Sequence, residues 1–203
     1  MTLVSVIVPT YNRAELLTTR ALPSILGQTH ADLEVLVVGD GTDSDTVAAM
    51  AEHPDSRVKF TNLPHQVYPE DDGQKWCVLG LNALNYGLDQ ASGEWIAVLA
   101  DDDEWVPDAI APLLALATER GVDFAYGKSV TDAGHWYGHW PPSAMNFTDG
   151  SYVYRNGMGY RYDPACIERG LPEDADLWIR MIEGGVTFAF LDQLVHLYYP
   201  NRR

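Results

Sequence analysis

The strongest constraint on the fold is a series of short, largely apolar and β-branched runs. Unlike half-exposed strands, these runs show little alternation with polar residues, which is typical of strands buried on both faces of a parallel sheet. The predicted strands are Val4–Val8, Glu34–Val38, Val58–Thr61, Trp95–Leu99 and Val122–Tyr126. Helices are predicted between them, from Asn12 onward and over Asp43–Glu52, Lys75–Ala91 and Ala109–Glu119. This alternation of strand and helix predicts an α/β sandwich with a mostly parallel central sheet.

Local signals refine this pattern at a few positions. Asn12 is a good N-cap for the first helix, and Pro23 should kink or split that helix because proline lacks a backbone N–H. Residues 129–162 are rich in Trp and Tyr without a clear period, so we expect short strands and loops there. Beyond them, a helix is predicted over Glu173–Glu183 and strands over Val186–Phe190 and Leu194–Tyr199.

Polar residues gather where three of the predicted strands end. Thr10, Tyr11 and Asn12 follow the first strand, Asp40 follows the second, and the run 101–103 (three aspartates) follows the fourth. In open α/β sheets, ligands bind outside the carboxyl ends of the strands. The sequence therefore predicts a binding site at this edge of the sheet.

Charge and cysteine content exclude several classes of function. The 203-residue chain has 13 basic and 29 acidic residues, a net charge of −16. This balance argues against general nucleic-acid binding and against electrostatic docking on anionic lipid. Cys77 and Cys166 lie far apart in sequence and are expected to be reduced thiols. We see no signal peptide and no apolar run of membrane-spanning length, so we expect a cytoplasmic protein without a membrane span.

Two acidic segments have the residue types needed for transfer chemistry. Asp101, Asp102 and Asp103 could hold Mg²⁺ or Mn²⁺ beside substrate phosphates, or could form a solvated turn that caps the following helix. Glu173 and Asp174 could supply a general base, or could simply favour a helix start. Candidate cations for a diphosphate are Arg13, Lys75 and Arg155, each of which could equally be a surface charge.

Four segments in this order and spacing resemble glycosyltransferase family 2. They are residues 5–17 (SVIVPTYNRAELL), 25–46, 85–110 and 172–181 (PEDADLWIRM), and the resemblance is weakest from about 128 to 165. It implies a GT-A (Rossmann-like) three-layer sandwich and an inverting, metal-dependent transferase of hexosyltransferase type. As one domain spanning residues 1–203, the chain would comprise a nucleotide-sugar half (1–127) and an acceptor half (128–203).

The resemblance also assigns roles by position. It implies that Asp40 contacts the base, that Asp102 holds the metal as the last residue of a DxD motif, and that Asp174 is the catalytic base. The remaining positions are Pro9, Thr10 and Tyr11 at the base and ribose, Asp101 in the centre of the DxD motif, and Glu173, Trp178 and Arg180 near the acceptor.

The chain departs from the family pattern at three positions. Gly39 replaces the first acidic residue of Asp-Asp-Gly, Ala100 replaces the first Asp of DxD, and Leu84 stands where many relatives carry arginine. Metal binding would then depend on Asp102, together with Asp103. Lys75, expected on the same helix as Leu84, is a candidate replacement for the arginine.

His196, on a predicted strand near the C-terminus, is either a late metal ligand or a structural residue. No QxxRW motif is present, so a processive polysaccharide synthase is not expected.

The expected activity is transfer of a sugar from a nucleotide-diphosphate sugar, with a UDP-sugar as the default donor and Mn²⁺ or Mg²⁺ on the diphosphate. The acceptor cannot be identified from the sequence. The alternative is a catalytically idle nucleotide-binding or scaffold domain that kept the fold, which Gly39, Ala100 and Leu84 would favour. A sugar-nucleotide pyrophosphorylase would need a Gly-rich, basic loop after the first strand, and residues 9–12 do not form one.

Overall fold

A computed structural model describes residues 2–144 and 146–200. Within them, nine strands form one sheet in the order β3-β2-β1-β4-β8-β6-β9-β5, with β7 beside β6. The first half of the sheet, β3-β2-β1-β4, is parallel, whereas β8 is antiparallel to both β4 and β6. The strands are β1 Val4–Thr10, β2 Leu33–Asp40, β3 Val58–Leu63, β4 Trp95–Val98, β5 Glu104–Trp105, β6 Phe124–Thr131, β7 Trp136–Tyr137, β8 Tyr152–Arg155 and β9 Phe188–Tyr198.

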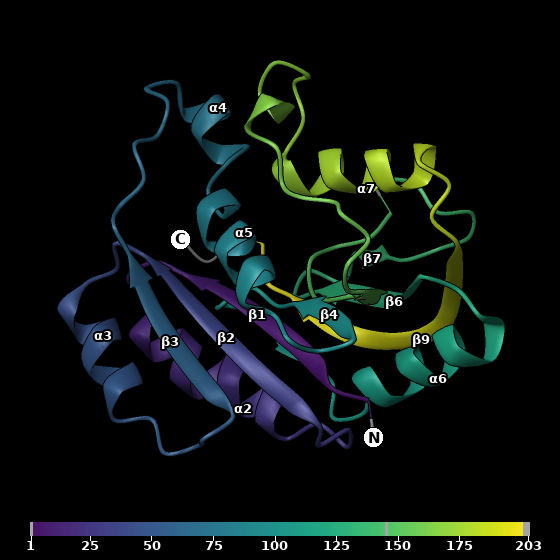
Figure 1. The fold of residues 1–203 in the computed structure, drawn as a ribbon, viewed down its shortest axis with the longest axis horizontal. Coiled ribbons are helices and arrows are strands. Elements are labelled where there is room, and N and C mark those ends of the chain that lie inside the picture. Colours follow the sequence, from purple (N-terminus) through teal and green to yellow (C-terminus); the bar gives the residue numbers. More distant parts are fainter. Residues whose placement is uncertain (1, 145, 201–203) are drawn as a thin grey trace.

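Helices cover both faces of the sheet, which makes three layers (Figure 1). Val4, Val6 and Val8 of β1 face one core, and Ile7 faces the other, because side chains alternate along a strand. The first core packs against α2 and α6, and the second against α5 and α7. The helical elements are α1 Ala14–Leu16, the π-helical η1 Leu17–Ala21, α2 Leu22–Leu26, α3 Ser44–Ala51, α4 Asp72–Trp76, α5 Leu81–Gln90, α6 Ile110–Arg120, the 3-10 helix η2 Pro164–Cys166 and α7 Glu173–Glu183.

The predicted sandwich with its mostly parallel sheet is confirmed. The first helical segment is not split at Pro23, because the π-helical η1 continues directly into α2, which has Pro23 in its first turn. Asn12, however, does not cap that segment. Its backbone is left-handed (φ 55°), and its side-chain Oδ1 accepts the N–H of Asp43 at 2.8 Å. Asn12 therefore joins the end of β1 to the start of α3.

Two further element predictions were wrong. The expected helix Lys75–Ala91 is interrupted between α4 and α5, because the Cys77 carbonyl accepts the N–H of Glu173 at 2.9 Å and Gly80 begins a new helix. Lys75 is thus not on the same helix as Leu84. The two predicted C-terminal strands are one continuous strand, β9, with register shifts where it passes β6. Cys77 and Cys166 are free thiols, and no described helix is long and apolar enough to cross a membrane.

Candidate functional site

The candidate site is a pocket of about 350 Å³ at the carboxyl ends of β1, β2 and β4. It unites polar groups from three strand ends, as the sequence predicts. Its lining also includes parts of the segment from β3 to α5, which forms one wall. The lining residues are Pro9, Thr10, Tyr11, Arg13, Asp40, His65, Tyr68, Lys75, Leu79, Gly80, Ala83, Ala100, Asp101 and Asp102.

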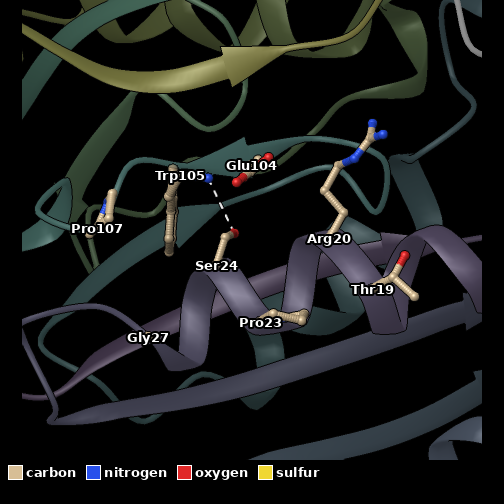
Figure 2. A pocket seen from close by; sticks show the side chains of 8 residues that line it. All are labelled: Thr19, Arg20, Pro23, Ser24, Gly27, Glu104, Trp105 and Pro107. Atoms are coloured by element: carbon tan, nitrogen blue, oxygen red, sulfur yellow. Dashed lines mark hydrogen bonds between the residues drawn. The ribbon is translucent and has the colours of Figure 1, made fainter.

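A second hollow, of about 430 Å³, lies between α2 and the β5 segment (Figure 2). Its lining holds none of the predicted site residues. The Ser24 hydroxyl connects the two sides of this hollow by accepting the N–H of Trp105 at 3.2 Å. Glu104 is the one carboxylate in its lining. We therefore take the pocket at the strand ends as the functional site.

One end of the site is aromatic. The rings of Tyr11 and His65 stack with centroids 5.3 Å apart, and Tyr11 is half exposed. Asp40 holds the surrounding loop, because its carboxylate accepts the Gln66 N–H at 3.0 Å and the Tyr68 hydroxyl. Burial and the neighbouring Asp40 raise the pKa of Tyr68, which keeps the phenol protonated. A flat heterocyclic ring such as a nucleobase suits this aromatic end.

Sequence reasoning missed His65 and Tyr68. Residues 62–74 look like an ordinary polar loop with two prolines. The available signal was the presence of aromatic rings in a segment that is otherwise rich in turn formers. The structure uses Tyr68 twice, since its hydroxyl donates to Asp40 and its ring lies 5.6 Å from the Lys75 ammonium group. Lys75 therefore does line the pocket, although from α4 and not from the helix of Leu84.

At the other end of the pocket, Asp101 and Asp102 contact Arg13. Arg13 Nη1 lies 3.0 Å from Asp101 Oδ1 and also donates to Asp102 Oδ2. Burial raises the pKa of Asp101 to about 6, although Arg13 and the hydroxyl of Thr10 favour its charged form. Burial and the neighbouring Asp103 raise the pKa of Asp102 as well. Two shielded carboxylates at this point attract cations.

Asp103 and His196 come together behind the pocket and do not line it. His196 Nε2 lies 3.1 Å from Asp103 Oδ2, and the other oxygen of Asp103 accepts the Tyr199 N–H at 2.8 Å. His196 Nδ1 lies 3.0 Å from the Thr148 hydroxyl oxygen. Both side chains are almost fully buried. The structure thus gives them internal partners, and their role as metal ligands stays a prediction.

Arg155 does not reach the site. Its guanidinium pairs with Glu94 at 2.9 Å and lies over the ring of Trp95, at the start of β4. It is therefore no candidate for binding a diphosphate in this pocket. Ala100 lines the pocket, whereas Leu84 is buried in the core, so neither supplies a charge.

The first turn of α7 carries two further carboxylates, Glu173 and Asp174, which do not line the pocket but lie on a helix that contacts it. Glu173 Oε1 accepts the N–H of Gly80, a pocket residue, at 3.0 Å. Asp174 Oδ1 accepts the N–H of Ala175 at 2.6 Å, and burial raises the pKa of Asp174. A carboxylate with a raised pKa is a better proton acceptor near neutral pH than an ordinary aspartate. Asp174 therefore has the character expected of a general base.

Trp178 and Glu173 do not lie at an open acceptor surface. Trp178 is 2% exposed and packs edge-on against Phe147 and Tyr152. Glu173 is 9% exposed and connects α7 to α5. Arg180 does not accompany them, since it pairs with Asp176 at 2.8 Å. Trp178 is buried because it belongs to the apolar face of α7, which packs this helix into the second core.

Asp149 is a carboxylate that sequence reasoning missed. It lies just before β8, and its Oδ1 accepts the hydroxyl of Tyr152. Burial and the charge of Asp174 raise its pKa well above the ordinary range. It precedes a glycine within an aromatic segment, and nothing in the local pattern distinguishes it from a turn residue.

The carboxylates of the pocket suit a metal shared with a substrate. Among residues 2–144 and 146–200, no group of three or more His, Cys, Asp or Glu side chains could hold a metal alone. Mg²⁺ and Mn²⁺ commonly take one or two carboxylates and complete their shell with phosphate oxygens and water. Asp101 and Asp102 fit this pattern, because both line the pocket and both supply oxygen ligands.

The fold and the pocket define an α/β protein that binds its ligand at the carboxyl ends of its strands, between aromatic rings and paired carboxylates. Comparison with known proteins identifies the family. The profile of glycosyl transferase family 2 matches residues 5–170, and the chain belongs to this family.

Similar curated proteins share the family over part of their length. The chain is 39% identical over 131 residues to the GalNAc(5)-diNAcBac-PP-undecaprenol beta-1,3-glucosyltransferase of Campylobacter jejuni, which covers 63% of this chain and 38% of that protein. It is 31% identical over 126 residues to the UDP-Glc:alpha-D-GlcNAc-diphosphoundecaprenol beta-1,3-glucosyltransferase WfgD of Escherichia coli, covering 62% of this chain and 45% of that one. The chain thus spans less than half the length of either relative.

Solved structures confirm the GT-A fold. TarS 1-349 of S. aureus superposes with a TM-score of 0.75 at 18% identity, covering 98% of this chain and 60% of that one. The mannosyltransferase PcManGT of Pyrobaculum calidifontis, solved with GDP-Man and Mn²⁺, gives a TM-score of 0.71 at 18% identity, covering 98% and 57%.

Proposed function

We propose that the chain is an inverting glycosyltransferase that moves a sugar from a nucleotide-diphosphate sugar to an acceptor hydroxyl. The observation that carries the proposal is that Tyr11, Asp40 and Asp102 line one and the same pocket at the strand ends. It offers a stacking surface for a base at one end and carboxylates at the other. Family membership supports the same reaction class.

The donor would lie along the pocket with its base at the aromatic end. Tyr11 would stack on the base, and Asp40 would act with Tyr68 and His65 to shape the base site. A UDP-sugar is the proposed donor, because similar proteins are named for UDP-Glc or were solved with UDP-GlcNAc. All lining residues fall between positions 9 and 102, which supports residues 1–127 as the donor half.

The diphosphate would lie at Asp101 and Asp102, with Arg13 and Lys75 as nearby cations. Asp102 and Asp101 would hold Mn²⁺ or Mg²⁺, which when bound would offset charge on the departing diphosphate. Arg13 and Lys75 would also reduce the repulsion between the acidic pocket and the two negative charges of the donor's diphosphate.

Asp174 would accept the proton of the attacking acceptor hydroxyl. Its buried carboxylate and raised pKa suit that task, and the preceding residue, Glu173, contacts Gly80 in the wall of the donor pocket. A single displacement from the side opposite the leaving diphosphate would invert the anomeric carbon. Residues 128–203, which include Asp174, are the proposed acceptor half.

A donor assay tests the proposal. The protein is incubated with UDP-glucose, UDP-GlcNAc and GDP-mannose in turn, with Mn²⁺ and a diphosphoundecaprenol-linked acetamido sugar, the acceptor class named for the relatives. We expect acceptor-dependent release of nucleoside diphosphate from one donor. Binding of a donor without any release, across a panel of acceptors, would favour the idle binding domain instead.

A further inference from the structure

His196 is a buried residue whose two ring nitrogens contact different parts of the chain. Its Nε2 lies 3.1 Å from Asp103 Oδ2. Its Nδ1 lies 3.0 Å from the hydroxyl oxygen of Thr148 and 3.2 Å from that of Ser129. The relative exposure of His196 is 0% and that of Asp103 is 1%. A side chain this enclosed acts through the residues that it contacts.

The contacts of His196 fix the direction of its hydrogen bonds. A carboxylate only accepts, so Nε2–H donates to Asp103, and Nδ1 accepts a hydroxyl proton. The hydroxyl oxygens of Ser129 and Thr148 lie 2.6 Å apart, so one of these groups donates to the other, which in turn donates to Nδ1. A continuous chain of hydrogen bonds therefore joins Asp103 to Thr148 through the imidazole.

The segment before β8 provides the space for this imidazole. Gly150 has a left-handed backbone (φ 102°), and a Cβ at this position would lie 2.5 Å from His196 Nε2. The Gly150 carbonyl also accepts the indole N–H of Trp105 at 2.6 Å. Only glycine fits beside the ring, so close packing fixes the position of the imidazole together with its hydrogen bonds.

Asp103 is the last residue of the turn 100–103, and the other three residues of this turn line the pocket. The Asp103 N–H closes the turn by donating to the carbonyl of its first residue at 3.2 Å. The side chain of Asp103 is attached to β9 and the residue after it, because its two oxygens accept from His196 Nε2 and from the N–H of Tyr199. The backbone pairing of β5 with β9 begins only at Glu104. The side-chain bonds of Asp103 therefore extend the attachment from β9 into the turn.

We propose that His196 is a positioning residue, whose bond to Asp103 holds the turn 100–103 so that Asp101 and Asp102 face the pocket. His196 touches neither metal nor nucleotide in this role. Through Nδ1 the same ring ties the turn to Thr148, so the proposed acceptor half fixes part of the donor pocket. The inference rests on the proposed function, because it takes metal-assisted nucleotide binding as the property that the turn supports.

Two substitutions separate the two ring nitrogens. The side-chain amide of glutamine can take the place of Nε2 and that of asparagine the place of Nδ1, so His196→Gln keeps the bond to Asp103 and His196→Asn keeps the bond to Thr148. Each variant loses one buried partner, and both should lose several degrees of Tm. Thr148→Val is the matched control, because it removes a hydroxyl on the Nδ1 side and leaves the bond to Asp103 in place.

Calorimetric titration of UDP into these proteins, each with and without Mn²⁺, tests the proposal. Mn²⁺ should tighten UDP binding to wild type, His196→Gln and Thr148→Val to the same extent. In His196→Asn this gain should fall by roughly tenfold or be lost, as expected when the support of a metal ligand is removed. A loss in both histidine variants, which a metal-ligating histidine would give, overturns the proposal. No loss in either variant, or a loss in His196→Gln alone, also overturns it.

Hydrogen exchange provides a readout that needs no ligand. The amide of Asp103 donates within the turn, and that of Tyr199 donates to Asp103 Oδ1, so both report on how the turn is held. Both amides should exchange faster in His196→Asn than in wild type, and at the wild-type rate in His196→Gln and Thr148→Val. Equal exchange in all four proteins would overturn the proposal. If UDP bound none of them while the exchange difference persisted, the proposed function would fail and the positioning role would stand.

Discussion

Two buried glutamates at opposite edges of the sheet have their pKa values moved in opposite directions. Glu34 lies near the start of β2, where the parallel strands have their amino ends, here called the amino edge; their carboxyl ends form the carboxyl edge. Burial alone would raise its pKa, but hydrogen bonds from Ser5, Lys59 and Ser92 outweigh burial and lower the pKa to about 2. Glu173 lies at the carboxyl edge, beside the pocket. Burial raises the pKa of Glu173 to about 8, because the hydrogen bond from the N–H of Gly80, which favours the charged form, is too weak to offset it.

The difference shows how one residue type serves two purposes. The oxygens of Glu34 are saturated with donors, so its charge helps to hold β1 to its neighbours. At the carboxyl groups near the pocket, burial outweighs the hydrogen bonds, and it raises the pKa of Asp101, Asp102 and Asp174 as well. The charge of Glu34 thus serves stability, whereas the carboxyl groups at the carboxyl edge are those proposed to take a cation or a proton.

The largest expected effect is on the carboxyl edge. Asp174→Asn should lower turnover by at least roughly a hundredfold, because the amide cannot accept a proton from the acceptor, while the Kd for nucleotide stays unchanged. Turnover is followed by release of nucleoside diphosphate and Kd by calorimetry. Asp176→Asn on the same helix turn is a poor control because Asp176 is paired with Arg169 and Arg180, so the exposed Glu183→Gln is used. Wild-type turnover in Asp174→Asn would remove the base assignment.

At the amino edge, the expected effect is on stability alone. Glu34→Gln should lose about 2 kcal/mol of unfolding free energy at pH 7, because four donors face a neutral group in place of a carboxylate. Nucleotide binding should not change. Urea unfolding measures the loss, with the exposed Glu119→Gln as the control. A stable variant with weakened nucleotide binding would contradict the division between the edges.

The Glu34 contribution should also depend on pH. Its folded pKa lies below its unfolded value of 4.5, so the stabilisation is present above pH 4.5 and is lost as the pH falls toward 2. Wild type and Glu34→Gln should therefore converge in stability in that acid range. A constant difference between them from pH 7 to pH 3 would show that the carboxylate charge is not the cause.

The pH dependence predicted for Glu173 has the opposite sign. The folded pKa of Glu173 lies above its unfolded value, so the folded state retains a proton between about pH 4.5 and pH 8 that the unfolded chain releases. Wild-type stability should therefore fall as pH rises through this window, by on the order of 1 kcal/mol per pH unit, and Glu173→Gln should flatten the slope. Unfolding curves at pH 5, 6.5 and 8 measure it. Identical slopes in the two proteins would count against the raised pKa.

The fold was largely predictable because its signal is local. Apolar runs such as Val4–Val8 and the acidic start of α7 specify their own elements, and the rule of strand ends brings Thr10, Asp40 and Asp101 together without knowledge of contacts. The break between α4 and α5 was not predictable, because it depends on the bond between Cys77 and Glu173, nearly a hundred residues apart.

The sequence predicted which residue types gather at the site better than it predicted which of them touch one another. The three aspartates look equivalent in sequence, yet Asp103 is buried against His196, whereas Asp101 and Asp102 face the pocket with Arg13. Trp178 resembled an acceptor residue and is a core residue, because the apolar face of α7 carries it inward. Whether such a side chain points into the pocket or into the core depends on the local backbone direction, and the spacing of residues in the sequence does not give that direction.

Calorimetric titration of UDP into the wild-type protein and Asp102→Asn, each with and without Mn²⁺, tests the proposed metal-assisted nucleotide site most directly. We expect Mn²⁺ to tighten UDP binding to wild type by roughly tenfold or more and to have little effect on the variant. GDP in parallel reports on the choice of base. No binding of either nucleotide to folded wild-type protein, or an equal effect of Mn²⁺ on both proteins, would contradict a metal-assisted nucleotide site at the carboxyl edge.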